Sequence, residues 1–442
     1  MEYRDALPKL TLFPQTAGVN EHGHLTIGGC DTTQLAVIYG TPLYVFDEAT
    51  VRAKCSEYRL EFGQRYSDTK AIYACKAFTS QALIRLLDEE GFGLDVVSGG
   101  EMHVAKSAGF PLDKVYFHGN NKGETELNRA LESGVGRIVV DNFHELALLG
   151  RLASELGKTQ DVLLRLSPGV DPHTHSHVAT GILDSKFGFP LTTGQAEEAL
   201  TKAVSTPSLH LIGLHFHLGS SLFEVEPYVQ AIDLVLQFAA QMKQRHRFEL
   251  RELNVGGGFA AQYLLDSPAP PVSRYAEAIA STLIKQTRKL KLEQPRLVIE
   301  PGRSIVARAG TALYRIGGSK DIPGVRRYVF VDGGMADNIR PALYDSRYEA
   351  VVANKMGKPE TEVVTIAGKF CESGDILVKD VCLPKLEAGD VLAMPTSGAY
   401  SIPMSSNYNA SLRPAIVMVK EGSARLITRR ETYSDLTVRD NL

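Results

Sequence analysis

Residues 71–97, AIYACKAFTSQALIRLLDEEGFGLDVV, contain the pattern that decides the fold. An apolar run, Ala71 to Lys76, is followed by a segment, Ser80 to Glu90, whose apolar residues lie three and four positions apart, and then by a second apolar run, Gly93 to Val97. Short apolar, β-branched runs are typical of buried strands, and the wider spacing is typical of an amphipathic helix. The stretch therefore predicts a strand, a helix and a second strand.

The same alternation continues to about residue 300. Six further predicted strands are Val115 to His118, Arg137 to Asp141, Val162 to Leu166, Leu211 to His217, Glu252 to Val255 and Arg296 to Glu300. Nearly continuous apolar strands alternating with helices, eight times over, are the pattern of a parallel, TIM-like (β/α)8 barrel. A doubly wound open sheet with fewer repeats is the alternative.

Beyond about residue 310 the rhythm changes. Gly, Pro and Asp turns, with little helical spacing, separate the runs Arg327 to Val331, Val363 to Ala367, Asp390 to Met394 and Ala415 to Val419. This pattern predicts a mainly β C-terminal domain, which the N-terminal segment completes. We expect the N-terminal segment to span 1–45, the barrel 46–309 and the β domain 310–442.

Composition narrows the class of protein. The chain has 442 residues, with 48 Lys and Arg against 51 Asp and Glu, so a broad basic surface for nucleic acid is not expected. Its 5 cysteines form no CxxC pair, which argues against a disulfide scaffold and a zinc knuckle. No apolar run is long enough for a membrane helix. We expect a cytoplasmic protein with no membrane or nucleic-acid partner.

Polar and glycine residues follow the predicted strands at the end where a barrel gathers its chemistry. They include Lys76, Asp95, residues 98–101, His118, Arg165, His215, His217, residues 256–258 and residues 300–303. Lys76 ends an apolar strand, where a desolvated amine has a lowered pKa and forms Schiff bases with aldehydes. A lysine that reaches out to solvent is the alternative.

The glycines at 256–258 remove Cβ atoms where a strand turns into a loop. Backbone N–H groups can then face a phosphate, although a tight turn alone would need the same residues. Arg303 would add a fixed charge for a phosphate or a carboxylate. Glu300 needs a buried partner, either a protonated pyridine nitrogen or an arginine.

Histidines leave a metal site open as an alternative. His215 and His217 lie two apart on a predicted strand and so point to one face. His173, His175 and His177 add three more. A metal-dependent barrel hydrolase would use such ligands, whereas an imidazole stacked on a cofactor ring needs no metal.

Two stretches of the β domain carry further candidates. Cys371 to Asp375, CESGD, places a thiol beside two carboxylates in a turn-like stretch, which suits proton transfer. Arg340 and Tyr344 lie four apart, which suits a dianionic substrate, with a surface ion pair as the alternative.

The ordered motifs resemble the diaminopimelate decarboxylases, a family in the alanine-racemase-like, fold type III group of pyridoxal phosphate enzymes. The resemblance covers nearly the whole chain. The motifs are YACKA (73–77), GLDVVSGGE (93–101), HGNNK (118–122), TGILDSKFGF (180–189), GLHFHLGS (213–220), NVGGGF (254–259), EPGRSIVARAGT (300–311), VDGGMADNIRPALYD (331–345), CESGD (371–375) and GAYSIPMSSNYN (398–409).

The resemblance implies pyridoxal 5′-phosphate as cofactor and no metal. Lys76 would form the Schiff base with the cofactor, His217 would stack on its ring, and Glu300 would keep the pyridine nitrogen protonated. The other cofactor-binding residues implied are Asp95, Ser220, Gly257, Gly258, Gly302, Arg303 and Tyr400.

The implied reaction is decarboxylation of meso-2,6-diaminopimelate to L-lysine and carbon dioxide, the last step of lysine biosynthesis. Cys371 would donate the proton and Glu372 would bind the distal amino group, both from the partner in a homodimer with shared active sites. Arg303, Arg340 and Tyr344 would bind the distal carboxylate, and Tyr400 would also belong to the substrate-binding residues.

Two residues depart from the family pattern. Phe78 stands where Asn is more common, and Ser221 replaces a common Gln. They leave open a decarboxylase of the same fold acting on ornithine, arginine, carboxynorspermidine or a siderophore precursor. A non-catalytic regulatory homologue is a further alternative, against which the intact Lys76, Glu300, Arg303 and Cys371 argue.

Overall fold

The computed structural model describes residues 7–171 and 185–441, and the chain forms two compact units. The barrel unit consists of Cys55–Ala260 and Pro270–Gly302. The β-rich unit consists of Met1–Lys54, Ala261–Ala269 and Arg303–Leu442. The units differ from the ranges expected from the sequence at three places. Residues 46–54, Ala261–Ala269 and residues 303–309 were expected in the barrel and belong to the β-rich unit.

Eight parallel strands close the barrel and confirm the predicted TIM-like architecture. They are β5 (Thr69–Ala74), β6 (Gly93–Val96), β7 (Val115–Phe117), β8 (Arg137–Val140), β9 (Gln160–Ser167), β11 (Leu209–His215), β12 (Glu252–Asn254) and β13 (Arg296–Ile299). Closure comes from pairing of β13 with β5 and of β8 with β9, which excludes an open sheet. A two-residue strand, β10 (Phe189–Pro190), adds to β9.

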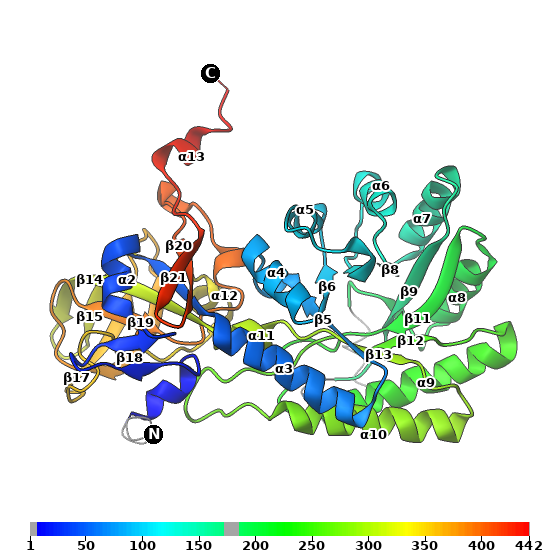
Figure 1. The fold of residues 1–442 in the computed structure, drawn as a ribbon, viewed down its shortest axis with the longest axis horizontal. Helices are drawn as coiled ribbons and strands as arrows, with labels where there is room; N and C mark the ends of the chain where they lie inside the picture. Colours follow the sequence, from blue (N-terminus) through cyan, green and yellow to red (C-terminus); the bar gives the residue numbers. More distant parts are fainter. Residues whose placement is uncertain (1–6, 172–184, 442) are drawn as a thin grey trace. The chain divides into compact units, whose positions relative to one another are not determined.

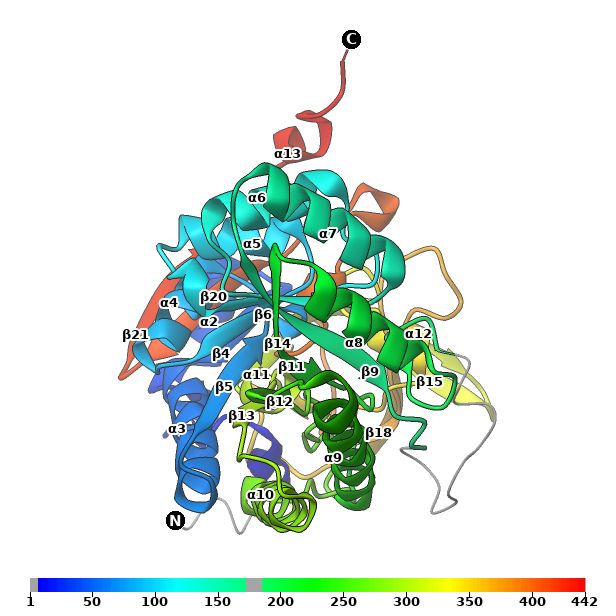
Figure 2. The same cartoon turned by 90° about the vertical axis from the view of Figure 1, so that its right-hand side faces the viewer.

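Helices lie around the outside of these strands (Figure 2). They are α4 (Gln81–Glu89), α5 (Gly99–Ser107), α6 (Glu124–Ser133), α7 (Phe143–Glu155), α8 (Gln195–Ser205), α9 (Glu226–His246) and α10 (Val272–Leu290). In α4 the Ser80 hydroxyl caps the helix by accepting the Leu83 N–H at 3.2 Å, and the apolar face of the helix is buried. The helical spacing read between Ser80 and Glu90 is thereby confirmed.

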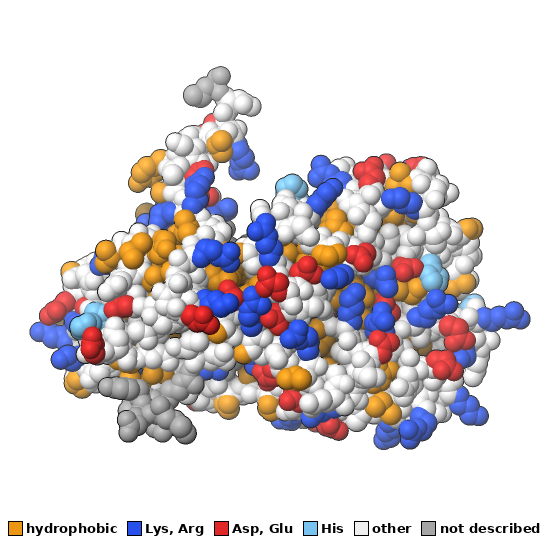
Figure 3. All heavy atoms as spheres, in the orientation of Figure 1, with side chains coloured by type: hydrophobic (Ala, Val, Ile, Leu, Met, Phe, Trp, Pro, Cys, Tyr) orange, Lys and Arg blue, Asp and Glu red, His pale blue; other side chains and the backbone are white. Residues whose placement is uncertain are grey.

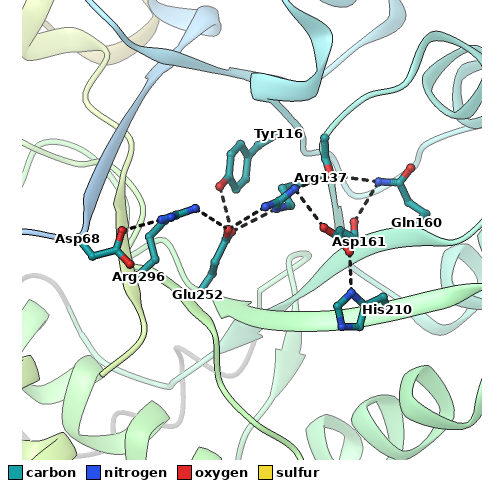
Figure 4. A network of polar contacts seen from close by, with 9 residues as sticks. Asp68, Tyr116, Arg137, Gln160, Asp161, His210, Glu252 and Arg296 are labelled. Atoms are coloured by element: carbon teal, nitrogen blue, oxygen red, sulfur yellow. Dashed lines mark hydrogen bonds and ion pairs between the residues drawn. The ribbon is translucent and has the colours of Figure 1, made fainter. Parts of the chain in front are cut away.

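The barrel interior is apolar in the middle and polar at its N-terminal end. Its central layer is formed by one buried residue from each of six strands: Ile72, Tyr116, Val139, Leu163, Ile212 and Val298. At the N-terminal end, Glu252 accepts hydrogen bonds from the Tyr116 hydroxyl at 2.9 Å and from Arg137 at 3.0 Å (Figure 4). Polar groups at this end of a barrel stabilise the fold, because the chemistry sits at the opposite end.

The β-rich unit is organised around the long strand β14 (Gly310–Ile322) (Figure 1). The first half of β14 pairs with β4 (Leu43–Asp47) and β19 (Val391–Met394), and its second half pairs with β15 (Arg326–Val331). The remaining strands are β16 (Val351–Val352), β17 (Glu362–Ala367), β18 (Ile376–Leu383), β20 (Ala415–Lys420) and β21 (Ser423–Thr428). Three short helices, α11 (Arg303–Val306), α12 (Arg340–Tyr344) and α13 (Tyr433–Thr437), belong to the same unit.

The N-terminal segment completes this unit, as the sequence predicts. It forms β1 (Gly18–Val19), β2 (Leu25–Ile27), β3 (Cys30–Asp31) and α2 (Thr32–Tyr39) before β4, and α3 (Glu48–Arg65) then leads into the barrel unit. Strand β4 lies between β14 and β20 in the sheet. Leu10, Leu25 and Leu35 share one buried core with Leu313 and Val417.

The surface mixes charges of both signs. On the face drawn in Figure 3, acidic and basic side chains alternate, in keeping with a net charge of -3. Within the part of the chain that the structure describes, no helix has the length and apolar character needed to cross a membrane.

Candidate active site

A cavity of about 670 Å³ opens at the C-terminal ends of the barrel strands. Its volume is that of a typical small-molecule site. The titratable side chains that line it come from six different strand ends: Lys76, Asp95, His118, Arg165, His215, His217 and Glu300. The structure thus brings together Lys76, Asp95, His217 and Glu300, four of the residues that the sequence assigns to one site.

Lys76 lies in the turn Cys75–Ala77 that follows β5, and its side chain is exposed at the cavity. The turn is tied to the end of β13 by the Ala74 N–H, which donates to the Pro301 carbonyl at 3.3 Å. A Cβ atom on Gly302 would lie 2.9 Å from the Ala74 Cβ. Gly302 therefore permits the close approach of the segment that carries Glu300 to the segment that carries Lys76.

Glu300 is buried at the end of β13 and receives three contacts on one oxygen. Its Oε1 accepts from Asn254 Nδ2 at 2.7 Å, and it lies 3.0 Å from His118 Nε2 and 3.6 Å from His215 Nε2. The other oxygen, Oε2, has no recorded protein contact among the described residues. Glu300 can therefore offer Oε2 to a group inside the cavity.

The charges of this cluster follow from burial and pairing. Burial alone would raise the pKa of Glu300, but the His118 and His215 imidazoles outweigh burial and hold the pKa well below its ordinary value. Burial would lower the pKa of His118, yet Asp95 and Glu300 outweigh it and raise that pKa. Burial lowers the pKa of His215 to about 4. The pairing thus favours an ionised Glu300 and a protonated His118, whereas burial favours a neutral His215.

The loop that carries His118 is held by a buried ion pair. Lys122 Nζ lies 2.8 Å from a carboxylate oxygen of Glu145 and donates to the Gly119 carbonyl at 2.6 Å. Asp95, on β6, is buried with a carboxylate oxygen 3.8 Å from His118 Nε2, and burial raises its pKa. These contacts fix the position of His118 against Glu300.

His217 is a neutral imidazole with a defined tautomer. Its Nδ1 accepts the Gly257 N–H at 3.2 Å, so its proton is on Nε2. Burial, together with the positive charge of Lys76, lowers the pKa of His217 well below its ordinary value. A flat, uncharged ring is therefore presented at the cavity.

The three glycines at 256–258 allow three loops to pack together. Cβ atoms there would lie 2.6 Å from the Phe216 carbonyl, 2.3 Å from the Glu300 carbonyl and 2.5 Å from the Gly219 carbonyl, respectively. The Gly256 N–H donates to Asn254 Oδ1 at 2.9 Å, so Asn254 links this loop to Glu300. Close packing is thus a sufficient reason for the glycines. The phosphate-binding role that the sequence predicts for Gly257 and Gly258 stays a prediction, as it does for Ser220, which is exposed beyond β11.

Two arginines of the β-rich unit surround one tyrosine. Arg303 Nη1 donates to the Tyr263 hydroxyl at 3.0 Å, and the Arg340 guanidinium lies 4.7 Å from the centre of the Tyr263 ring. Arg340 is 7% exposed and donates to the Tyr348 hydroxyl at 2.5 Å. Among the described residues Arg340 has no recorded ion pair, so its buried charge is met only by neutral phenols. The Tyr400 ring lies 4.6 Å from the Arg303 guanidinium.

The remaining predicted residues of this unit are exposed. Tyr344 is 60% exposed, and no contact with the arginine cluster is recorded for it. Cys371 and Glu372 lie on an exposed loop, where the Cys371 N–H donates to Asn409 Oδ1 at 3.1 Å and Tyr408 donates to Glu372 Oε1. Tyr400 therefore contacts an arginine, and Tyr408 contacts Glu372.

Comparison with known proteins identifies the family. Residues 48–307 match the family model for the pyridoxal-binding domain of pyridoxal-dependent decarboxylases. The chain belongs to this family. The decarboxylase is 46% identical over 425 residues to diaminopimelate decarboxylase of Bacillus subtilis (strain 168), covering 96% of this chain and 97% of the relative. It is 48% identical over 419 residues to that of Bacillus methanolicus, covering 95% and 97%.

Solved structures agree with these relatives. The structure of diaminopimelate decarboxylase from M. jannaschii in complex with L-lysine is similar at a TM-score of 0.92 and 37% identity, over 97% of this chain and 98% of that one. A lysine/ornithine decarboxylase from Vibrio vulnificus, at a TM-score of 0.74 and 24% identity, shares the fold. The resemblance that the sequence motifs carry is confirmed.

The cavity of the decarboxylase fits pyridoxal phosphate. It combines an exposed lysine amine for an aldehyde, an ionised carboxylate with a free oxygen for a pyridinium nitrogen, and a neutral imidazole for the ring face. Asp95 Oδ1 and His215 Nδ1 are buried without a hydrogen-bond partner among the described residues. Such orphaned polar atoms are expected where a polar ligand completes a site.

Sequence reasoning assigned no role to several residues of the decarboxylase that the structure places in these clusters. His118 and Asn254 stand inside the quoted motifs HGNNK and NVGGGF, so a signal was present. Tyr263 and Tyr348 carry no motif signal. His118, His215 and Glu300 bring possible metal-ligand atoms within 4.8 Å, a set that lacks His217. His173, His175 and His177, and residues 180–184 of one motif, lie outside the described residues.

Proposed function

We propose that this decarboxylase converts meso-2,6-diaminopimelate to L-lysine and carbon dioxide with pyridoxal 5′-phosphate, the last step of lysine biosynthesis. The substrate is inferred from the surroundings of Arg340, a buried guanidinium whose partners among the described residues are the neutral side chains of Tyr263 and Tyr348. A buried charge needs a counter-charge. The distal carboxylate of diaminopimelate supplies one, and lysine has none to supply.

The residues that line the barrel cavity would hold the cofactor. When bound, pyridoxal phosphate carries the substrate through its aldehyde, and its pyridinium ring accepts the electron pair released with carbon dioxide. Lys76 would bind the aldehyde, and Glu300 would accept the pyridinium N–H. The neutral His217 would cover one ring face without repelling the pyridinium charge. Ser220, Gly258, Arg303 and Tyr400 would supply the phosphate contacts, whereas Gly257 and Gly302 would let the backbone approach the cofactor closely. Asp95 would support the ring side through His118.

Residues of the β-rich unit would bind the distal carboxylate of the substrate. Arg340, with Arg303, binds the distal carboxylate, and Tyr344 and Tyr400 add hydrogen bonds. A substrate that lacks this carboxylate leaves Arg340 buried without a counter-charge, which costs about 3 kcal/mol or more. The same penalty discriminates against lysine and ornithine.

Proton delivery is assigned to the exposed loop of Cys371 and Glu372. Cys371 returns a proton to the α-carbon after carbon dioxide leaves, and Glu372 binds the distal amino group. Both side chains are exposed on their own chain, which suits a loop offered to a partner's active site in a homodimer. A cytoplasmic location agrees with five cysteines of which none forms a disulfide, two of them exposed.

Carbon dioxide release tests the proposal directly. Purified protein with added pyridoxal phosphate is assayed with meso-diaminopimelate, L-lysine, L-ornithine and L-arginine in parallel. Release from meso-diaminopimelate alone is the expected result. Release from ornithine or arginine instead would contradict the substrate while leaving the cofactor chemistry in place. A regulatory homologue would release nothing from any substrate.

A further inference from the structure

Asp375, the last residue of the CESGD stretch, ends the loop that carries Cys371 and Glu372. Its side chain does not face solvent with the rest of the loop, because the residue is only 3% exposed. The established fold places it just before β18, and neither the cofactor nor the substrate assignment uses it.

The Asp375 carboxylate accepts two backbone hydrogen bonds from different segments. Oδ1 accepts the Met335 N–H at 2.7 Å, and Oδ2 accepts the Phe370 N–H at 2.9 Å. The Gly368 N–H donates to the Asp375 carbonyl at 2.9 Å. One residue thus ties both ends of the loop to each other and to a second segment.

Two glycines make room for this carboxylate. A Cβ on Gly368 would lie 2.1 Å from Asp375 Oδ2, and a Cβ on Gly334 would lie 2.4 Å from Oδ1. The Lys369 N–H also donates to the Gly333 carbonyl at 3.1 Å. The backbone on both sides is therefore shaped around the carboxylate.

The two segments that meet at Asp375 carry different parts of the proposed chemistry. Residues 333–335 lie five to seven positions before Arg340 in the sequence, and Arg340 is the residue proposed to bind the distal carboxylate. Residues 368–375 carry Cys371 and Glu372, which are offered to the partner subunit. We infer that Asp375 is a positioning residue that fixes the Cys371 loop to the backbone leading to Arg340, and so sets where the thiol delivers its proton.

This inference rests on the proposed function, since it gives Asp375 its role through Cys371. Phe370 N–H and Met335 N–H both point at carboxylate oxygens, so an amide at this position keeps one acceptor and turns an NH₂ group toward the other N–H. Asp375→Asn therefore loosens the loop without changing the size of the side chain. A shift of about 1 Å in a catalytic group lowers a rate by up to about 100-fold.

The test compares Asp375→Asn with Asp321→Asn, which changes an exposed carboxylate of the same unit. Lysine formed per carbon dioxide released is measured on the holoenzyme with meso-diaminopimelate. We expect one lysine per carbon dioxide in the wild type and in Asp321→Asn. In Asp375→Asn we expect slower turnover and a ratio below one, because part of the electron pair left behind by carbon dioxide would be protonated on the aldehyde carbon of the cofactor instead of on the α-carbon. Hydrolysis would then release an aldehyde and the aminated cofactor in place of lysine.

Thiol alkylation gives a second readout. Cys371 and Cys382 are both exposed free thiols of the β-rich unit, so Cys382 serves as an internal reference. We expect the rate of Cys371 alkylation by iodoacetamide, relative to Cys382, to change at least about twofold in Asp375→Asn and to stay constant in Asp321→Asn.

The outcomes separate the inference from the function on which it rests. A wild-type protein that releases no carbon dioxide from meso-diaminopimelate contradicts the proposed function. The positioning role alone is overturned if the wild type is active and Asp375→Asn is merely slower. In that case the variant forms one lysine per carbon dioxide, and its alkylation ratio is unchanged. If Asp375→Asn does not fold, Gly368→Ala is used instead, because its Cβ displaces the Asp375 carboxylate. One lysine per carbon dioxide in Gly368→Ala would overturn the inference.

Discussion

His118 Nε2 lies 3.0 Å from Glu300 Oε1 and 3.8 Å from Asp95 Oδ1, so one imidazole stands between two buried carboxylates. Each carboxylate favours the protonated imidazole, and the protonated imidazole favours the ionised carboxylate. The pair keeps Glu300 charged inside a cavity where burial alone would neutralise it. A charged Glu300 is the form that can hold a pyridinium N–H.

Replacing His118 should weaken cofactor binding. In His118→Asn the positive charge beside Glu300 is lost, so the pKa of Glu300 rises and the carboxylate protonates more readily as the pH falls. We expect the Kd for pyridoxal phosphate, measured by titration of the apoprotein, to rise about tenfold at pH 8, and by more at pH 6. His103→Asn, which changes an exposed histidine of α5, is the control. Equal affinities at both pH values would remove His118 from this role.

Lys76 should be indispensable for holding the cofactor. Lys76→Ala removes the amine at the cavity, so we expect neither the visible absorption band of bound pyridoxal phosphate nor carbon dioxide release. Lys76→Arg keeps a positive charge but offers no amine that reacts with an aldehyde, and it should fail in the same way. Full activity of either variant would contradict the assignment.

The positions of the barrel strands could be predicted from the sequence, but the contacts between side chains at their ends could not. A strand buried in a parallel barrel is a continuous apolar run, so Val162 to Leu166 marks β9 without further information. The pairing of His118 with Glu300 depends on closure of the barrel between β13 and β5, which no local pattern encodes. Tyr263 likewise meets Arg340 only because Ala261–Ala269 crosses into the β-rich unit.

The glycines at 256–258 show how one sequence motif can have more than one cause. The sequence is compatible with an anion-binding loop, in which backbone N–H groups face a phosphate, and with a tight turn. The structure adds that a Cβ on Gly257 would lie 2.3 Å from the Glu300 carbonyl and that the Gly257 N–H is directed at His217. Steric reasons of this kind require the positions of neighbouring loops, which spacing along the chain does not give.

Arg340 should control substrate choice. In Arg340→Ala we expect kcat/KM for meso-diaminopimelate to fall by about 100- to 1000-fold, the cost of removing one partner of a buried charge pair. Tyr348→Phe removes one hydrogen bond to the guanidinium and should lower kcat/KM about tenfold. Tyr433→Phe, on an exposed side chain of α13, should change nothing. Wild-type kcat/KM in Arg340→Ala would contradict the distal-carboxylate role.

Glu252 should stabilise the barrel without affecting catalysis. Its buried carboxylate is the counter-charge for Arg137 at 3.0 Å, at the end of the barrel opposite the cavity. Glu252→Gln keeps the size but leaves the guanidinium without that charge, so we expect a loss of about 3 kcal/mol and a melting temperature several degrees lower, with kcat unchanged.

The control for Glu252 is an exposed ion pair of the same unit. Glu277 lies 2.9 Å from Arg65, and its side chain is 67% exposed. Glu277→Gln should change the free energy of unfolding by less than about 1 kcal/mol. Equal melting temperatures for the two variants would show that the polar network in Figure 4 does not stabilise the barrel.

Asp337 should make stability depend on pH. It is buried, and burial raises its pKa to about 7, although the Gly334 N–H donates to its Oδ1 at 2.8 Å. Between about pH 4, where the unfolded side chain titrates, and pH 7, the folded state holds a proton that the unfolded state has lost. Stability from this group is therefore fully present below pH 4 and is lost as the pH rises toward 7.

Asp337→Asn stays neutral throughout, so its stability relative to the wild type should rise by up to about 4 kcal/mol over this window. Melting temperatures at pH 5, 6 and 8 check this, and a difference that is constant with pH, as expected for Asp321→Asn, would show that Asp337 is ionised in the folded protein.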